Sequence, residues 1–268
     1  MIELIKKIVF RNKDSEEIYC IHNTKKYFFK INWLNYKALP LKQAHKIPFI
    51  IGYNCKIKKI GKIKLGDKVY LGMVSIGVIR IDTLETNANK TIFYNGGKIT
   101  FQGRAKFHPG SKLCVNSNAI ISFGKRNSFG CNTKIVSQCA ICIGNDFRIS
   151  WDSQIFDTDF HFLKKVTTGK TYTRKKSVII GDNVFIGNSS TIGKGTKIPS
   201  GCVISCCSKV TGDYSIDGEN LLIAGNPAKV LAKGFVMGNS WFPEQECKDA
   251  DSLNERKMVQ QIQKDLNL

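Results

Sequence analysis

The chain has 268 residues and a formal net charge of +20, from 41 lysines and arginines against 21 aspartates and glutamates. This length is enough for one large domain, and the basic excess favours an anionic partner: a nucleic acid, an anionic membrane face or a phosphorylated small molecule. Residues 1–10 are too short and interrupted for a secretory signal, and no apolar run approaches the roughly 20 residues of a membrane-spanning helix. We expect a cytoplasmic protein, with peripheral contact to the inner membrane face as a further hypothesis.

The ten cysteines do not have the spacing of a metal site or a disulfide framework. Cys139 and Cys142 form a CxxC-like pair, but no second pair or paired histidine follows them. We interpret most of the cysteines as small buried hydrophobic residues in a reducing compartment.

The first segment, residues 1–48, contains aromatic and basic residues without a regular period, and we expect a mixed N-terminal cap or arm there. From about residue 49 to residue 232 the chain has a period of six. Aliphatic residues recur at unbroken six-residue intervals at Ile180, Ile186, Ile192, Ile198, Ile204 and Val210. An earlier run repeats the pattern at Phe123, Phe129, Ile135 and Ile141.

A period of six is neither the period of a helix nor the alternation of a flat strand. It fits a prism-shaped coil in which each of three short strands places one aliphatic side chain inside and ends at a corner of Gly, Asn, Asp or Ser. One coil cannot bury its own apolar face, so several must stack into three parallel sheets. The alternative, a β-sandwich with coincidental spacing, would show turns every 8 to 12 residues or so. The sequence therefore predicts an all-β parallel β-helix.

The period lapses in two places, which predicts two loop excursions, at residues 82–97 and 162–177. The second excursion carries six basic residues and no acidic residue. The C-terminal tail, residues 233–268, contains a predicted amphipathic helix over residues 244–268, which we expect to cap the open end of the stack.

Three motifs occur in order within the predicted coils. Residues 157–161 read Asp-Thr-Asp-Phe-His and precede the second excursion, residues 180–187 read Ile-Gly-Asp-Asn-Val-Phe-Ile-Gly, and residues 223–230 read Ile-Ala-Gly-Asn-Pro-Ala-Lys-Val. Over roughly residues 60–232 the chain resembles the hexapeptide-repeat acyltransferases, whose fold is a left-handed parallel β-helix. Among them it resembles capsular and lipopolysaccharide sugar O-acetyltransferases and the galactoside and maltose acetyltransferases.

The resemblance implies transfer of an acetyl group from acetyl-CoA to a sugar hydroxyl of a surface-glycan precursor, of capsule or lipopolysaccharide, with His161 as the general base. The chemistry agrees, because imidazole titrates near neutral pH and can accept the hydroxyl proton during attack on the thioester. Either Asp157 or Asp159 would orient the imidazole, and the sequence does not decide between them. A second coil histidine, His108, lies in a predicted corner, where we interpret it as structural.

The resemblance also places the donor site in the later coils. It assigns contacts with the CoA arm to Asn188, Cys206 and Thr211. It places Lys229 near the phosphates, where a cation is favourable, and Phe185 beside the active-site groove. Members of this family are usually trimers with active sites between subunits, so the resemblance implies a homotrimer.

Several other functions are weighed against this one. The same fold and histidine would serve N-acetylation of a nucleotide-linked amino sugar. A zinc lyase of this fold needs three histidine ligands, but only two histidines lie in the predicted coils, so we expect no metal. Nucleic-acid binding would predict a recognition helix or stacked aromatic residues, and we find neither motif. A non-catalytic β-helix is disfavoured because a passive solenoid has no reason to break its register beside His161.

Overall fold

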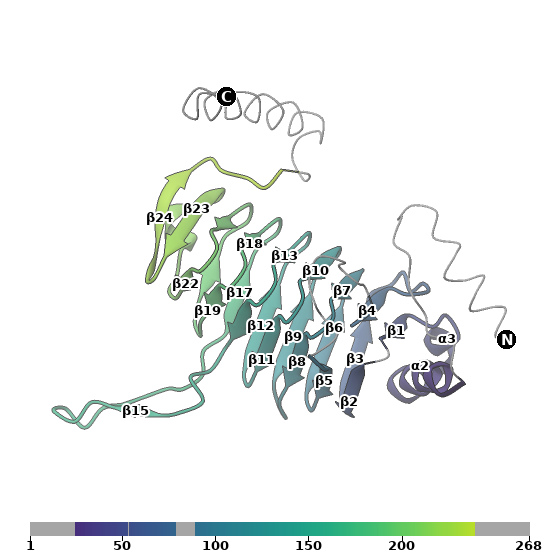
Figure 1. Cartoon of the computed structure of the whole chain (residues 1–268). Coiled ribbons are helices and arrows are strands. Elements are labelled where there is room, and N and C mark those ends of the chain that lie inside the picture. The colour runs from purple at the N-terminus through teal and green to yellow at the C-terminus, as the bar shows by residue number, and fades with distance from the viewer. Residues whose placement is uncertain (1–24, 53, 79–88, 239–268) are drawn as a thin grey trace, which may run out of the picture.

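The computed structural model describes residues 25–52, 54–78 and 89–238, which form a three-sided prism of stacked coils (Figure 1). Sheet A has nine strands: β1 (Phe49–Ile51), β4 (Val74–Ile76), β7 (Ala105–Phe107), β10 (Asn127–Phe129), β13 (Arg148–Ile149), β18 (Phe185–Ile186), β21 (Val203–Ile204), β23 (Leu221–Gly225) and β24 (Ala228–Lys233). Sheet B has seven: β2 (Cys55–Lys59), β5 (Thr91–Asn95), β8 (Lys112–Val115), β11 (Lys134–Ser137), β14 (Gln154–Phe156), β19 (Thr191–Ile192) and β22 (Lys209–Val210). Sheet C has six: β3 (Lys62–Leu65), β6 (Lys98–Phe101), β9 (Ile120–Phe123), β12 (Ala140–Ile143), β17 (Val178–Ile180) and β20 (Lys197–Ile198).

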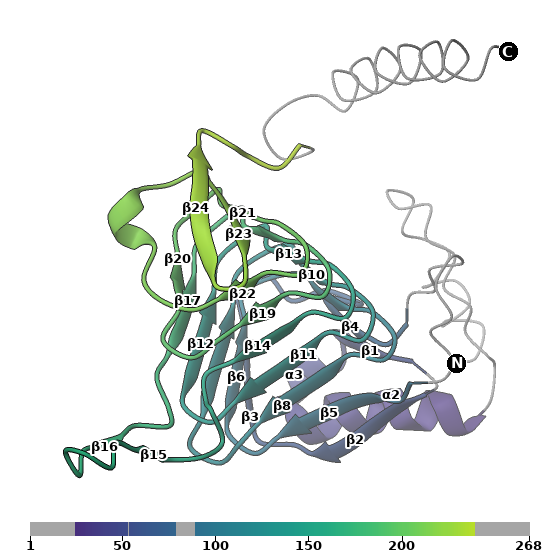
Figure 2. The same cartoon turned by 60° about the vertical axis from the view of Figure 1, so that its left-hand side comes forward.

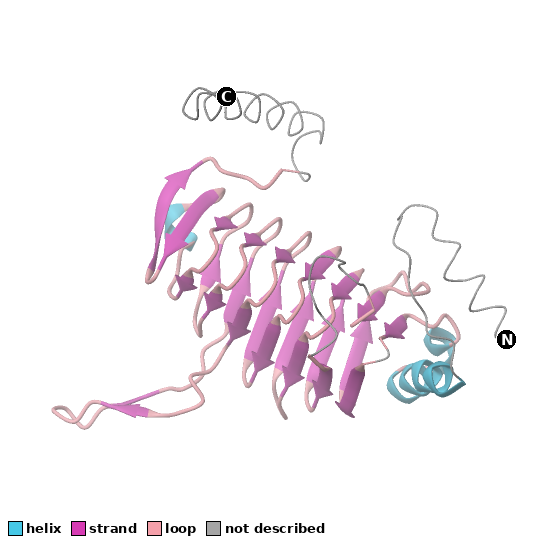
Figure 3. Ribbon diagram, in the orientation of Figure 1, coloured by secondary structure: helices cyan, strands magenta, loops and turns pink. Residues whose placement is uncertain are grey.

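Neighbouring strands of each sheet are parallel except for β23 and β24, which pair antiparallel. Each sheet takes every third strand along the chain for most of its length, so the chain visits the three faces in turn (Figures 2 and 3). The predicted fold class, an all-β left-handed parallel β-helix, is confirmed.

The coils become shorter toward the C-terminal end of the prism. In sheet B, Ile135 pairs with Leu113, 22 positions earlier, and Ile155 pairs with Ile135, 20 positions earlier. Val210 pairs with Ile192, 18 positions earlier, which is the predicted coil length. The strands shorten as well, from four residues in β8 and β11 to two in β19 and β22.

The width of each coil follows the side chains that fill it. A four-residue strand such as β9 sends two side chains inward, Ile121 and Phe123, whereas a two-residue strand sends one. The wide coils therefore hold stacked phenylalanines, and the rings of Phe107 and Phe129 lie parallel with centroids 4.4 Å apart. The narrow coils are filled by the buried aliphatic residues of the six-residue run: Ile180, Ile186, Ile192, Ile198, Ile204 and Val210.

The corners stack in register from coil to coil. At the corner between sheets A and B, Asn132, Asp152, Ser189 and Cys207 all have φ of 57° or 58°, the left-handed conformation that a sharp turn requires. The backbone N–H of Cys207 donates to the carbonyl of Asn188 at 2.9 Å, and the equivalent bonds join the preceding coils. These bonds continue the ladders of the sheets around the corner, so few corner groups are left unpaired.

The N-terminal end of the prism is covered by α2 (Lys25–Ala38) and α3 (Leu41–Ala44) (Figure 1). Ile31 and Leu34 of α2 are buried in the core. The buried side-chain amide of Asn35 accepts from the backbone N–H of Phe49 and donates to its carbonyl, both at 2.9 Å. α2 therefore satisfies part of the exposed edge of β1, which would otherwise be open to pairing with another chain.

The structure differs from the prediction at the first excursion. Residues 82–97 were expected to leave the prism, but Thr91–Asn95 forms β5, which pairs with both β2 and β8. Every second side chain of β5 points into the core. The buried residues therefore recur every two positions in this strand, and the six-residue spacing is not visible in the sequence there. The predicted C-terminal helix, residues 244–268, lies outside the described residues.

No helix in the described part of the chain has the length and apolar character needed to cross a membrane.

Candidate active site

The second excursion is a hairpin arm that leaves the prism at the corner between sheets B and C (Figure 2). We call residues 158–175 the arm. Its base is closed by a bridge between Thr158 and Lys175 and by a bond from the backbone N–H of Asp159 to the carbonyl of Arg174 at 2.9 Å. Beyond the base, β15 (Leu163–Lys164) and β16 (Thr171–Tyr172) pair antiparallel. The arm therefore begins and ends at the same corner of the prism. β14 before it and β17 after it keep their places in sheets B and C.

His161 lies just beyond the base of the arm and is exposed. The residue before it, Phe160, has φ of 64°, which is costly for a bulky residue and turns the chain sharply. The ring of Phe160 lies edge-on to that of Phe156 on sheet B, with centroids 5.7 Å apart. The guanidinium of Arg174 lies 4.9 Å from the centroid of the Phe162 ring on the other side of His161. The residue before His161 therefore packs on sheet B, whereas the residue after it contacts the other strand of the arm and is 66% exposed, as is usual for an outlying arm.

Asp157 is fully buried, and both of its carboxylate oxygens are occupied. It accepts from the hydroxyl of Ser137 at 2.6 Å and from the backbone N–H groups of Gln138 at 2.7 Å and Cys139 at 2.8 Å. All three donors belong to the equivalent corner of the preceding coil. The structure thus shows Asp157 holding two corners together, and no hydrogen bond joins it to His161 among the described residues.

Asp159 forms an ion pair with Lys194, which lies at the same corner one coil later. The ammonium of Lys194 also donates to the carbonyl of Thr173 at 2.7 Å, so one side chain fastens both strands of the arm to the prism. Sequence reasoning missed Lys194. Its only signal is its place between Gly193 and Gly195 in a corner, which carries no chemical motif.

The residues predicted to contact the donor are spread over two strands and two corners. Phe185 points outward from sheet A, Asn188 and Cys206 lie at the corner between sheets A and B, and Thr211 lies at the corner between sheets B and C. The methyl group of Thr211 packs near Gly193, next to the base of the arm. Lys229 is exposed on β24, at the C-terminal end of sheet A. One chain therefore does not bring all five residues to a single groove.

The described cysteines are less buried than predicted. Cys55, Cys131 and Cys202 are buried, but Cys142, Cys206 and Cys207 are exposed. The exposed thiols occupy an outward strand position or a corner, neither of which the period of six assigns to the core. All eight described cysteines are free, and no cluster of three or more His, Cys, Asp or Glu residues suited to a metal occurs in the described part of the chain.

Comparison with known proteins gives relatives but no family model that matches. WbbJ of Escherichia coli K12, a protein named for O-acetyl transfer in lipopolysaccharide biosynthesis, is 28% identical over 149 residues, 52% of this chain and 74% of WbbJ. The polysialic acid O-acetyltransferase of Escherichia coli O1:K1 is 28% identical over 136 residues, 49% of this chain and 43% of that protein. The chain is similar to polysaccharide O-acetyltransferases. This similarity confirms the predicted resemblance and the predicted enzyme class, acyltransferase.

Among solved structures, the polysialic-acid-specific acetyltransferase NeuO matches over 73% of this chain and 80% of its own, with a TM-score of 0.48 and 22% identity.

Proposed function

We propose that the protein transfers an acetyl group from acetyl-CoA to a sugar hydroxyl of a surface-glycan precursor, with His161 as the general base. The observation that carries the proposal is an exposed histidine just beyond the base of the arm, in a chain similar to two O-acetyltransferases. The neutral imidazole takes the hydroxyl proton as the sugar oxygen attacks the thioester carbonyl. The C–S bond then breaks, and the CoA thiolate takes the proton from the imidazolium, which restores the neutral base.

The two aspartates have different roles in this proposal. Asp157 positions the corner that carries the arm, because its carboxylate is buried and fully engaged. Asp159 is the candidate for orienting the imidazole or an acceptor hydroxyl, because it is exposed and a carboxylate can accept more bonds than its ion pair with Lys194 uses.

We further propose a homotrimer with the donor site between neighbouring chains. The predicted donor residues Cys206 and Thr211 lie at different corners of one coil, so a groove between two prisms brings one corner from each chain together. The arm also exposes Phe162, Leu163 and Val166, the last with 93% of its surface accessible, and apolar groups exposed to this extent usually meet a partner. Sedimentation of the purified protein tests the trimer.

The test of the activity is free-thiol release from acetyl-CoA with a panel of sugar and glycan acceptors. We expect acceptor-dependent release that falls by about 10² to 10⁴-fold in His161→Ala, the usual worth of a general base. His108→Ala is the matched control, because His108 lies at a different corner, between sheets A and B. Transfer that survives His161→Ala would contradict the assignment of the base, and transfer only to amino sugars would indicate an N-acetyltransferase.

Peripheral contact with an anionic membrane remains a prediction from the net charge. It requires that the protein sediment with anionic liposomes at low salt and not with neutral ones.

A further inference from the structure

The helix α2 is apolar on two sides. Ile31 and Leu34 point into the core of the prism and are buried. Phe29, Trp33 and Tyr36 follow the spacing i, i+4 and i+7, which places them on one stripe of the helix, and all three are exposed. Phe29 has 71% of its surface accessible and Trp33 44%. Grouped apolar side chains that face water usually mark a site of interaction with a protein or a membrane.

The short helix α3 extends this apolar surface. A hydrogen bond of 3.0 Å joins the hydroxyl of Tyr36 to Nδ1 of His45, the residue directly after α3. Leu41, the first residue of α3, stands one helical turn before His45 and has 67% of its surface accessible. We call the surface formed by Phe29, Trp33, Tyr36 and Leu41 the end face. It belongs to the two helices that cover the N-terminal end of the prism (Figure 1).

The end face lies in a segment that is rich in lysine and has no carboxylates. Residues 18–66 contain eleven lysines and no Asp or Glu. Lys37, Lys42 and Lys46, which belong to the two helices and the turn after them, are exposed. None of these three lysines forms an ion pair within the described part of the chain. The aromatic stripe is therefore flanked by positive charge that no acidic side chain of its own segment offsets.

This lack of carboxylates distinguishes the N-terminal end from the rest of the prism. The strands of the later coils have no acidic residues either, but their corners carry Asp146, Asp152 and Asp182. At the C-terminal end, the exposed Ile216 lies in the short helix η1 (Ser215–Asp217), which itself contains an aspartate. Exposed apolar side chains and unopposed lysines thus coincide at the N-terminal end.

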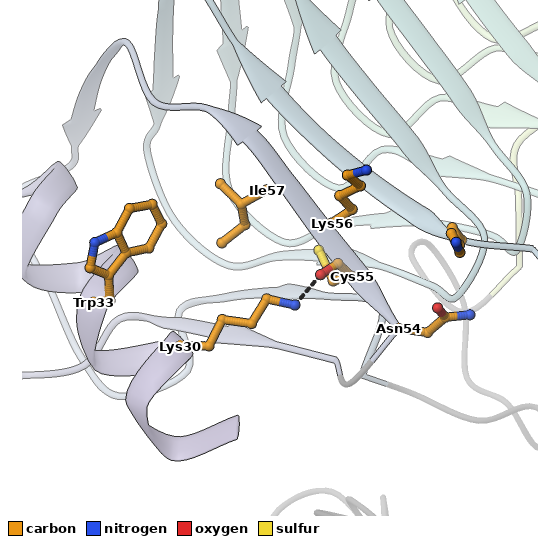
Figure 4. A pocket seen from close by; sticks show the side chains of 7 residues that line it. Lys30, Trp33, Asn54, Cys55, Lys56 and Ile57 are labelled. Carbon is orange, nitrogen blue, oxygen red and sulfur yellow. Dashed lines mark hydrogen bonds between the residues drawn. The ribbon is translucent and has the colours of Figure 1, made fainter. Parts of the chain in front are cut away.

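A cavity of about 360 Å³ opens beside the end face, between Trp33 of α2 and the edge strand β2 (Figure 4). Its described lining includes Lys30, Lys56 and Lys90 and no Asp or Glu. The ammonium of Lys30 donates to the carbonyl of Cys55, which fixes its position at the cavity. Ammonium groups beside an exposed indole suit a phosphate group at the boundary of an apolar phase.

We propose that the end face docks on an anionic lipid bilayer, with Phe29, Trp33 and Leu41 in the interfacial layer and the nearby lysines on lipid phosphates. Trp side chains are favoured at the level of the headgroups, and lysines beside an apolar helix face are attracted to anionic lipids. A second copy docked face to face suits this surface less, because it would bring like charges together. Net charge alone selects no surface for the predicted membrane contact, whereas the end face does, and docking there is independent of His161.

The apolar part of the contact is tested by vesicle flotation of the full-length protein without acetyl-CoA. The probes are vesicles of phosphatidylethanolamine with phosphatidylglycerol and vesicles of phosphatidylcholine alone. Phe29→Gln with Trp33→Gln removes the stripe and keeps helix-forming side chains. Ile216→Gln with Leu231→Gln is the matched control, because both are exposed apolar residues at the opposite end of the prism.

We expect the wild type and this control to bind the anionic vesicles and not the phosphatidylcholine vesicles, and the Phe29 and Trp33 variant to bind about tenfold more weakly or worse. A wild type that binds neither kind of vesicle would overturn the proposal, and so would equal binding by the two double variants. Circular dichroism shows that each variant is folded.

The charged part of the contact is tested by two triple variants that remove the same charge. Lys37→Gln, Lys42→Gln and Lys46→Gln act beside the end face, and we expect them to weaken binding about tenfold at low salt. The matched control removes three exposed lysines from the sides of the prism: Lys98→Gln, Lys134→Gln and Lys209→Gln. Equal loss in both triple variants would contradict docking by the end face, because net charge alone would then explain the binding.

The emission of Trp33 separates insertion into lipid from attraction to its surface. Trp33→Phe keeps an apolar ring, so it should still bind the anionic vesicles. The wild type should show a blue shift of tryptophan emission when these vesicles are added, and Trp33→Phe should show none. A blue shift that persists in this variant would place the lipid contact at another tryptophan and overturn the assignment.

Other occupants of the end face give different results in the same variants. Binding of transfer RNA that is stronger than vesicle binding and falls in the Phe29 and Trp33 variant would make the face a nucleic-acid site. Sedimentation in which the wild type associates and this variant does not would assign the face to a second copy. Either result would overturn docking on lipid. Because binding is measured without acetyl-CoA, an absence of acetyl transfer would contradict the proposed function and leave this result unchanged.

Discussion

The carboxylate of Asp157 illustrates how a residue in a catalytic-type motif can serve the fold. It lies two residues before Asp159 in the same short motif, yet its three donors all come from the preceding corner. The sequence could not separate the two aspartates, because the corner that holds Asp157 lies about one coil earlier and is brought near only by stacking.

We therefore predict that Asp157→Asn destabilises the protein by about 2 kcal/mol, since an amide presents a donor to groups that are themselves donors and leaves one of them unpaired. Asp159→Asn, at a partly exposed ion pair, should change the free energy of unfolding by no more than about 1 kcal/mol. Urea denaturation measures both. Unchanged stability with lost transfer in Asp157→Asn would instead make it a catalytic residue.

Asp213 provides a pH-dependent contact at the C-terminal end of the prism. Hydrogen bonds from the ammonium of Lys197, at 2.6 Å, and from the hydroxyl and backbone N–H of Ser215 lower the pKa of Asp213 to about 2. Because the folded pKa is below the unfolded one, the stabilisation is complete above the unfolded pKa of about 4 and is lost as the pH falls through the folded value. An NMR titration of the carboxyl should have its midpoint near 2, and Lys197→Met should raise it.

At the scale of an element, the arm is joined to the prism by few contacts beyond its base. The ammonium of Lys194 pairs with Asp159 and donates to the carbonyl of Thr173, so it bridges the two strands of the arm. A contact of this kind, partly open to solvent, contributes little to global stability but limits local opening.

Lys194→Met should therefore leave the urea midpoint nearly unchanged while cleavage within residues 162–174 by a protease becomes several-fold faster. Lys197→Met, at the next strand of sheet C, is the control and should not alter cleavage of the arm. Cleavage at the wild-type rate in Lys194→Met would mean that the other contacts at the base hold the arm without Lys194.

The core of the whole molecule changes from aromatic to aliphatic along the prism, and each part depends on its own packing. The buried Phe129 ring lies 4.4 Å from Phe107, 5.3 Å from Phe123 and 5.5 Å from Phe147, measured between centroids. Phe129→Ala should cost about 3–5 kcal/mol, and Ile186→Val in a narrow coil only about 0.5–1.5 kcal/mol. Thermal or urea denaturation measures the difference, and equal losses would show that the aromatic column has no special packing.

The sequence predicted the narrow coils well because each of their strands buries one side chain, so Ile180 and Ile186 stand six residues apart. It predicted the wide coils poorly, because β8 buries Leu113 and Val115 only two residues apart and the added residues break the period. The motif at residues 157–161 located the arm and His161. The contact with Lys194 could not be read from the sequence, since it depends on which residues the coils place side by side.

The closed base of the arm has a consequence for how proteins of this type diversify. Ile155 pairs with Ile192, 37 positions later, although a narrow coil has 18 residues, so the excursion adds 19 residues without shifting the ladder on either side. Recombination at this corner can therefore replace one arm with another of different length, and the rest of the solenoid need not adapt. An exchange of this kind would change the side chains that lie beside His161 and leave the stacked coils as they are.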